Sequence, residues 1–205
     1  MRTDPMPAEV VEGLRGRLAA AAEDLDANQV AALLLQVTAE YGVAACWEQL
    51  CVPLLATLRG RTAFEVATEH ALVEGVRVGL DGVGREPARH LPAGGVLLAG
   101  AEQETHCLGL HALAAALRER GRGCLLLGPA LPWVALDRAV RRAGPTTVVV
   151  WAQTPVAGRA HRLARLARAF PGVRVHAAGP GWAEPLAPPS ARLATLTAAT
   201  AACLR

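Results

Sequence analysis

The sequence contains no lysine, so all 21 of its basic side chains are arginine. Its 18 acidic residues leave a net charge of +3, which is too small to indicate a protein that binds nucleic acid. The absence of lysine is better explained by a GC-rich coding bias than by a binding role. Aromatic residues make up only 3% of the chain, so alanine, leucine and valine must build its core.

Long apolar runs and paired cysteines are also missing. No apolar stretch reaches about 18 residues, and no basic segment followed by an apolar one opens the chain. The five cysteines form no Cys-x-x-Cys pair, and their odd number and scattered positions are typical of reduced thiols. We therefore expect a soluble cytoplasmic protein with no membrane partner. Hydrophobic residues form 52% of the 205 residues, enough for a sizeable core.

The first half of the chain has a helical period. Apolar residues recur at helical spacing, with short loops between them, in four segments: 10–24, 29–41, 44–59 and 62–83. Pro53 is expected to bend the third segment or to divide it in two. Four helices joined by short loops predict an antiparallel four-helix bundle over residues 6–86.

Residues 84–94 are rich in proline and glycine and are predicted to form a linker. The spacing of the apolar residues changes after them. Short apolar runs at 95–99, 123–127, 146–151 and 172–177 then alternate with helical stretches at 107–121, 132–143 and 157–169. This alternation predicts a Rossmann-like, doubly wound parallel sheet over residues 93–205, and hence an α/β fold class. Such sheets bind ligands beyond the carboxyl ends of their strands, where four loops of this chain are expected to meet.

One of these loops carries a carboxylate two residues before a histidine, Glu104-Thr105-His106, with Gly109 three residues further on. The acid can accept the hydrogen bond of one ring nitrogen, which fixes the tautomer and leaves the other nitrogen free for a metal. Glycine at 109 removes a side chain where a bulky ligand would pass. Short motifs recur by chance, and the alternative is a loop histidine that Glu104 holds for local order. The position at the ligand-binding edge favours His106 as a metal ligand.

These residues resemble the cobalamin-binding module shared by methionine synthase, corrinoid proteins and certain light-responsive regulators. In that family a helical bundle caps a Rossmann-like domain, and the motif Asp-x-His-x-x-Gly supplies the lower cobalt ligand. Glu104, His106 and Gly109 match it, with the glutamate that is common among CarH-type and AerR-type regulators. The resemblance implies that His106 binds cobalt, that Glu104 orients it, and that the nucleotide tail passes Gly109 into the sheet. It implies cobalamin as cofactor, in the form of adenosylcobalamin, methylcobalamin or hydroxocobalamin.

The remaining family positions fall on the other strand-exit loops. Trp151 stands where the family has the serine of a Ser-x-Leu motif, and Gly179 and Gly181 stand where it has a glycine pair. Together with Gly128, these residues would line the nucleotide tail. Because an indole is much larger than serine, Trp151 either stacks on the base of the tail or narrows its pocket.

The bundle carries a second match to the family. CarH-type regulators have a tryptophan, nine further residues and then Glu-His on the helix that covers the upper cobalt face. Glu69 and His70 fit the end of this pattern, whereas Arg59 stands at the tryptophan position. The resemblance makes these three residues candidates for contacts to the upper face of the cofactor. The alternative is a solvated Glu-His pair at the end of a bundle.

The resemblance implies a cobalamin-binding sensory protein that controls transcription, with light among the candidate signals. The DNA-binding domain of CarH-type regulators is missing, so we expect action through a transcription factor, another protein partner or a change of homo-oligomer, without direct nucleic-acid contact. Whether the chain is a stand-alone protein or a piece of a longer regulator stays open. Two alternatives also stay open: a corrinoid carrier for enzymatic methyl transfer, and a degenerate module that binds haem or no cofactor. No nucleophile–base pair or phosphate loop indicates an enzyme.

Overall fold

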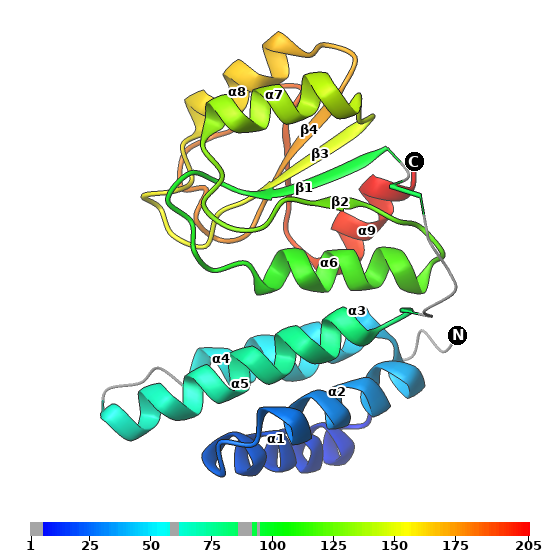
Figure 1. The fold of residues 1–205 in the computed structure, drawn as a ribbon, viewed down its shortest axis with the longest axis vertical. Helices are drawn as coiled ribbons and strands as arrows, with labels where there is room; N and C mark the ends of the chain where they lie inside the picture. Colours follow the sequence, from blue (N-terminus) through cyan, green and yellow to red (C-terminus); the bar gives the residue numbers. More distant parts are fainter. Residues whose placement is uncertain (1–5, 58–61, 86–91, 94) are drawn as a thin grey trace. The chain divides into compact units, whose positions relative to one another are not determined.

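The computed structural model describes residues 6–57, 62–85, 92–93 and 95–205, and its internal contacts divide the chain into two compact units, Met1–Pro87 and Ala88–Arg205. The first unit is helical (Figure 1). Its elements are α1 (Ala8–Glu23), α2 (Ala27–Tyr41), α3 (Val43–Cys46), the π-helical turn η1 (Trp47–Cys51), α4 (Val52–Thr57) and α5 (Ala63–Gly82). None of the helices among the described residues is long and apolar enough to cross a membrane.

Side chains at the ends of these helices explain where they begin. The Asp26 carboxylate accepts a hydrogen bond of 2.9 Å from the backbone amide of Gln29 and caps α2. Thr62 and Glu65 form a reciprocal capping box at the start of α5, with hydrogen bonds of 2.8 and 3.2 Å. Both starts agree with the helices predicted from the apolar period.

Pro53 interrupts the third predicted helix, as expected. Because proline has no amide hydrogen, the carbonyl of Gln49 has no donor four residues later. Arg15 of α1 donates two hydrogen bonds to that carbonyl instead, at 3.1 and 2.7 Å. The chain takes the π-helical turn η1 directly before α4, and the freed carbonyl ties this segment to α1.

Glycines on α5 let α2 approach closely. A Cβ atom added at Gly75 would lie 2.5 Å from Cβ of Val30 and 2.7 Å from the carbonyl oxygen of Ala27. A Cβ atom at Gly79 would lie 2.8 Å from a methyl group of Leu34. Backbone therefore packs against backbone between these two helices, which leaves little room for any side chain at position 75.

We expect Gly75→Ala to destabilise the helical unit by about 1–2 kcal/mol, because the overpacking cost exceeds the gain in helix propensity. Gly16→Ala is the matched control, since nothing lies within 4 Å of a Cβ atom at that position of α1. It should stabilise the protein by up to about 1 kcal/mol. Urea unfolding followed by circular dichroism measures both changes. Equal stabilisation by the two substitutions would contradict the close contact between α2 and α5.

The second unit is a three-layer α/β domain. Its elements are β1 (Val96–Gly100), α6 (Leu108–Glu119), β2 (Leu125–Leu126), α7 (Trp133–Ala143), β3 (Thr147–Trp151), α8 (Ala160–Ala169), β4 (Arg174–Ala178), β5 (Ala191–Leu193) and α9 (Leu196–Leu204). The described strands form one parallel sheet of five in the order β2-β1-β3-β4-β5. Helices α7 and α8 cover one face and α6 and α9 the other (Figure 1). The predicted doubly wound fold is confirmed, and β5 and α9 are additions to it.

The strand register fixes which side chains face which layer. Val148 and Val150 of β3 belong to the core that Leu136 of α7 and Leu163 of α8 also enter. Since side chains alternate along a strand, Trp151 at the end of β3 points to the opposite layer, that of α6 and α9. The order of the strands reverses between β1 and β3. That reversal is the topological switch point at which open α/β sheets bind their ligands.

Candidate functional site

The loops that follow β1, β2, β3 and β4 meet at the carboxyl edge of the sheet, as predicted. Backbone hydrogen bonds of 2.8 to 3.0 Å join them, from Gly100 to Gly128, from Ala101 to Trp151 and from Ala152 to Ala178. The four loops that were predicted to bind a ligand therefore lie together at the carboxyl edge of the sheet.

Glu104 is the centre of this edge. Its side chain is only 1% exposed, and both carboxylate oxygens are bonded. Oε1 accepts hydrogen bonds from the backbone amide and from Nδ1 of His106, at 2.8 and 2.9 Å. Oε2 accepts from the backbone amides of Gln153 and Thr154, at 2.7 and 3.0 Å. One carboxylate thus clamps the loop after β1 to the loop after β3.

The ionisation of Glu104 determines the tautomer of His106. Burial would raise the pKa of the Glu104 carboxyl, but the hydrogen bonds from His106, Thr154 and Gln153 outweigh it and hold the pKa below its ordinary value. The carboxylate is therefore charged at neutral pH and can only accept. Nδ1 of His106 must then carry the hydrogen, which leaves the lone pair of Nε2 free.

The His106 imidazole itself faces outward. Its side chain is 68% exposed, although its backbone amide and one ring nitrogen are both fixed by Glu104. An oriented imidazole with an open nitrogen is the arrangement that a metal ligand requires, and the buried carboxylate behind it is the usual orienting partner. The structure brings Glu104 and His106 together as the sequence predicted.

Cys107 follows His106 in the sequence, but its side chain is buried. Burial, and then the charge of Glu104, raise the pKa of the Cys107 thiol to about 11. The thiol therefore stays protonated at neutral pH and is a poor nucleophile. Of these two neighbouring side chains, the imidazole is the exposed one.

Trp151 packs between two of the predicted glycines. A Cβ atom at Gly109 would contact the six-membered ring of the indole, with Cζ2 at 2.7 Å, and one at Gly179 would lie 3.1 Å from Cδ2. Gly179 also has a φ of +91°, a conformation that favours glycine. The indole therefore fills the space between the first turn of α6 and the loop after β4. Whether Trp151 would stack on a cofactor tail or narrow its pocket stays a prediction.

Gly181 and Gly128 hold different positions along the edge. Gly181 donates a hydrogen bond of 2.9 Å to the carbonyl of Ala152, and a Cβ atom there would lie 2.8 Å from the amide nitrogen of Thr154. It thus supports the loop that binds Glu104. Gly128 has a φ of +76° and nothing within 4 Å of a Cβ atom. Their predicted contacts to a cofactor tail stay predictions.

The candidate upper-face residues belong to the helical unit. Glu69 and His70 lie on α5, where Glu69 is half-buried and His70 is exposed. Arg59 lies outside the described residues. Their predicted contacts to the upper face of a cofactor also stay predictions.

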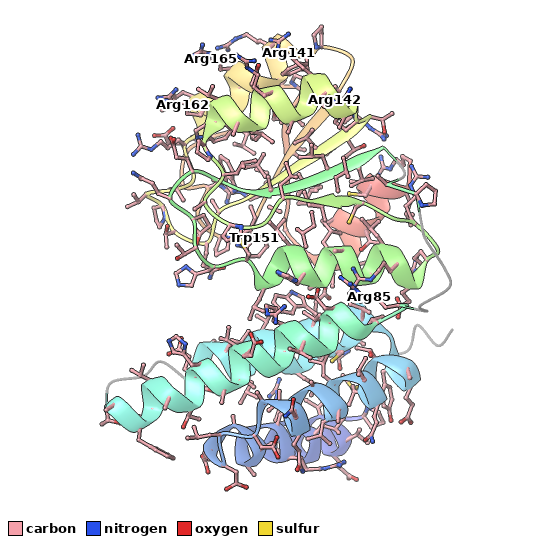
Figure 2. All side chains as sticks on the ribbon, in the orientation of Figure 1. Arg85, Arg141, Arg142, Trp151, Arg162 and Arg165 are labelled. Carbon is pink, nitrogen blue, oxygen red and sulfur yellow. The ribbon has the colours of Figure 1, made fainter. Side chains whose placement is uncertain are left out.

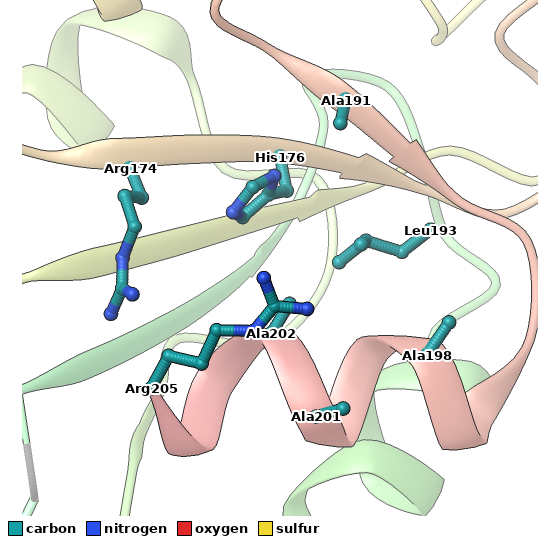
Figure 3. A pocket seen from close by; sticks show the side chains of 8 residues that line it. All are labelled: Arg174, His176, Ala191, Leu193, Ala198, Ala201, Ala202 and Arg205. Carbon is teal, nitrogen blue, oxygen red and sulfur yellow. The ribbon is translucent and has the colours of Figure 1, made fainter.

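A separate hollow of about 270 Å³ lies between β4, β5 and α9 and shares no lining residue with the Glu104–His106 edge (Figure 3). Its polar lining consists of Arg174, His176 and Arg205, and the rest is alanine and leucine. Arg174 donates a hydrogen bond of 2.7 Å to the hydroxyl of Thr147. Burial, followed by the charges of the two arginines, lowers the pKa of His176. The sequence pattern had assigned no role to these residues.

No family model and no curated protein matches this sequence. Among solved structures, the monomethylamine corrinoid protein of Methanosarcina barkeri is similar with a TM-score of 0.64 and 14% identity, over 94% of this chain and 98% of that chain. A novel cobalamin-binding protein from Desulfitobacterium hafniense gives a TM-score of 0.45 and 15% identity, over 94% and 97% of the two chains. The methanol:cobalamin methyltransferase complex MtaBC of Methanosarcina barkeri gives 0.38 and 16%, over 87% and 74%. At such identities the first similarity establishes a shared fold.

Proposed function

We propose that this protein binds a corrinoid, with Nε2 of His106 as the lower axial ligand of the cobalt. One observation carries the proposal: an exposed imidazole is held by a buried, ionised carboxylate at the switch point between β1 and β3. One imidazole supplies one coordination position, so it suits a metal that arrives with its other ligands, as cobalt does in a corrin ring. Haem iron meets the same description, but the fold shared with a corrinoid protein favours cobalt.

The residues of the chain have distinct parts in this proposal. Glu104 keeps the hydrogen on Nδ1 and thereby presents the lone pair of Nε2. The amides of Gln153 and Thr154 donate hydrogen bonds to the second oxygen of that carboxylate and hold it in place, so the imidazole that it binds has one fixed orientation. A bound alkylcorrinoid would supply a cobalt–carbon bond that can be cleaved by light or by transfer of its alkyl group.

We further propose that the chain is a sensor that controls transcription through a transcription factor, another protein partner or a change of oligomeric state. Support comes from the glutamate at 104, which the resemblance associates with regulators, and from the Glu69–His70 pair on α5. On this proposal the chain is not itself an enzyme. The form of the upper ligand would be the signal, and adenosyl-, methyl- and hydroxocobalamin are the forms to compare.

A corrinoid carrier for enzymatic methyl transfer is the second candidate. Its support is the similarity to the monomethylamine corrinoid protein, which extends over 94% of this chain and therefore over both of its units. In this case a partner methyltransferase would perform the transfer, and His106 would keep the same role below the cobalt.

Absorption titration of the purified protein tests the proposal. We expect saturable binding of one hydroxocobalamin per chain, with a shift of the visible bands that reports coordination by a protein imidazole. Adenosylcobalamin in the dark and after illumination, followed by size-exclusion chromatography, separates the two candidates. A light-dependent change in elution supports the sensor, whereas acceptance of a methyl group from a methyltransferase without a light response supports the carrier. Binding of haem but of no corrinoid would contradict both.

A further inference from the structure

The indole of Trp151 fills the space beside Gly109. This space is bounded by the first turn of α6 on one side and by the loop at Gly179 on the other, and the indole of Trp151 lies between them. Trp151 is the last residue of β3 and is paired in register with Gly100 of β1 and Ala178 of β4. Figure 2 shows Trp151 next to the beginning of α6. The indole therefore occupies the part of the carboxyl edge that lies at the switch point.

The contacts leave the ring little freedom. Gly109 and Gly179 both lie against the indole. A Cβ atom at Gly109 would contact Cη2 and Cζ3 of the ring, and one at Gly179 would lie 3.1 Å from Cδ2. Close-packed interiors accommodate extra atoms poorly. A second bulky group in this space would have to displace the indole first.

The indole brings one polar atom into this space. Nε1 of Trp151 is buried, and no described residue accepts a hydrogen bond from it. The ribose and phosphate of a buried nucleotide tail need several hydrogen-bond partners, and this single donor belongs to the ring that fills the space. The imidazole of His106 lies outside this space and stays exposed. The chain therefore offers a cobalt ligand but no room behind Gly109 for a tail.

On the basis of the proposed function, we propose that this site binds corrinoids with the nucleotide tail outside the protein, and that it favours tail-less corrinoids of the cobinamide class over cobalamin. Cobinamide has no nucleotide base to compete with His106 for the lower cobalt position. Cobalamin must release its own base from the cobalt, and the filled space gives that base and its tail no compensating contacts. Trp151 is thus a residue that determines ligand specificity, while His106 supplies the bond.

The test compares aquacobinamide and hydroxocobalamin by absorption titration in the wild type and in Trp151→Ser. We expect the wild type to bind aquacobinamide about tenfold more tightly, a ratio typical of steric discrimination by a packed pocket. In Trp151→Ser the affinity for hydroxocobalamin should rise about tenfold, while that for aquacobinamide changes by less than about threefold. Trp151→Phe keeps most of the volume and should keep the wild-type preference. If the serine variant does not fold, the comparison of the two corrinoids in the wild type still tests the proposal.

Trp133→Phe is the control, because Trp133 belongs to the core on the α7 and α8 side of the sheet. It should leave the preference between the two corrinoids unchanged. Equal or tighter binding of hydroxocobalamin by the wild type would overturn this inference and leave the proposed function standing. Failure of the wild type to bind either corrinoid would overturn the proposed function and the inference with it.

Discussion

Replacing His106 with alanine is expected to lower the affinity for hydroxocobalamin and aquacobinamide about a hundredfold, since loss of the ligand itself should cost at least as much as loss of an orienting partner. The side chain is 68% exposed, so its removal leaves no cavity, and the fold should lose only about 1–2 kcal/mol for the hydrogen bond that Nδ1 donates to Glu104. The visible bands of any corrinoid that still binds should lose the signature of a protein imidazole. Absorption titration and electron paramagnetic resonance of the Co(II) form, which reports a coordinated nitrogen, measure the two effects.

His161→Ala is the matched control, because His161 lies exposed on α8, on the other face of the sheet. It should bind both corrinoids as the wild type does. Added imidazole should restore part of the spectral signature to the His106 variant, since it replaces the missing ligand at the open cobalt position. Unchanged affinity and unchanged spectra in His106→Ala would show that the exposed imidazole is held in place for local order alone.

Glu104→Gln should destabilise the α/β unit by about 3 kcal/mol, because the amide group of glutamine must face amide donors at one end of the clamp. The carboxylate accepts from two donors of His106 on one oxygen and from Gln153 and Thr154 on the other. An NH₂ group at either position leaves buried donors without an acceptor. Corrinoid affinity should also fall about tenfold to a hundredfold, since the imidazole loses its orienting partner. Urea unfolding of the protein without cofactor measures the first effect and absorption titration the second.

The pH dependence of stability provides an independent check on Glu104. Because its folded-state pKa lies below the ordinary value, the ionised carboxylate stabilises the folded protein above the unfolded-state pKa of about 4.3. This contribution is lost as the pH falls through the lower folded-state pKa. The difference between wild type and Glu104→Gln should therefore shrink in that acidic range. Glu102→Gln, the same change two residues earlier in the loop, should differ from wild type by less than about 0.5 kcal/mol. If the free energies of unfolding of wild type and Glu104→Gln differed by the same amount at every pH, the ionised Glu104 carboxylate would not be what joins the two loops.

Much of the fold follows from the apolar period, and the exceptions have physical causes. The strand β5 has three residues, all exposed or half-buried, so it carries no apolar run that a sequence pattern detects. Helix α9 is composed mainly of alanine, threonine and leucine and has no distinct polar face, so it shows no amphipathic stripe. The interruption of the α-helix before α4, by contrast, was predictable from Pro53, because the missing amide hydrogen is a property of the residue itself.

In the candidate site, contacts between residues close in sequence were predictable, and contacts between distant residues were not. Glu104 and His106 are two residues apart, so their pairing depends on local chain geometry and was predictable. The donors to the second carboxylate oxygen are backbone amides 49 and 50 residues further along, and backbone amides carry no signature in a sequence. Their proximity depends on the strand order that places β3 beside β1.

The helical first unit, the parallel sheet of the second unit and the pairing of Glu104 with His106 could all be predicted from residue patterns. Periodicity and spacing are local properties, so they can be recognised along the chain. The contact of Trp151 with Gly109 and Gly179 became visible in the folded chain alone. These residues come from three separate strand exits, and their contact is set by the packing of a sheet against α6. Because packing determines which volume stays open to a ligand, the identity of the residues alone could not show whether the indole would meet a cofactor tail or exclude it.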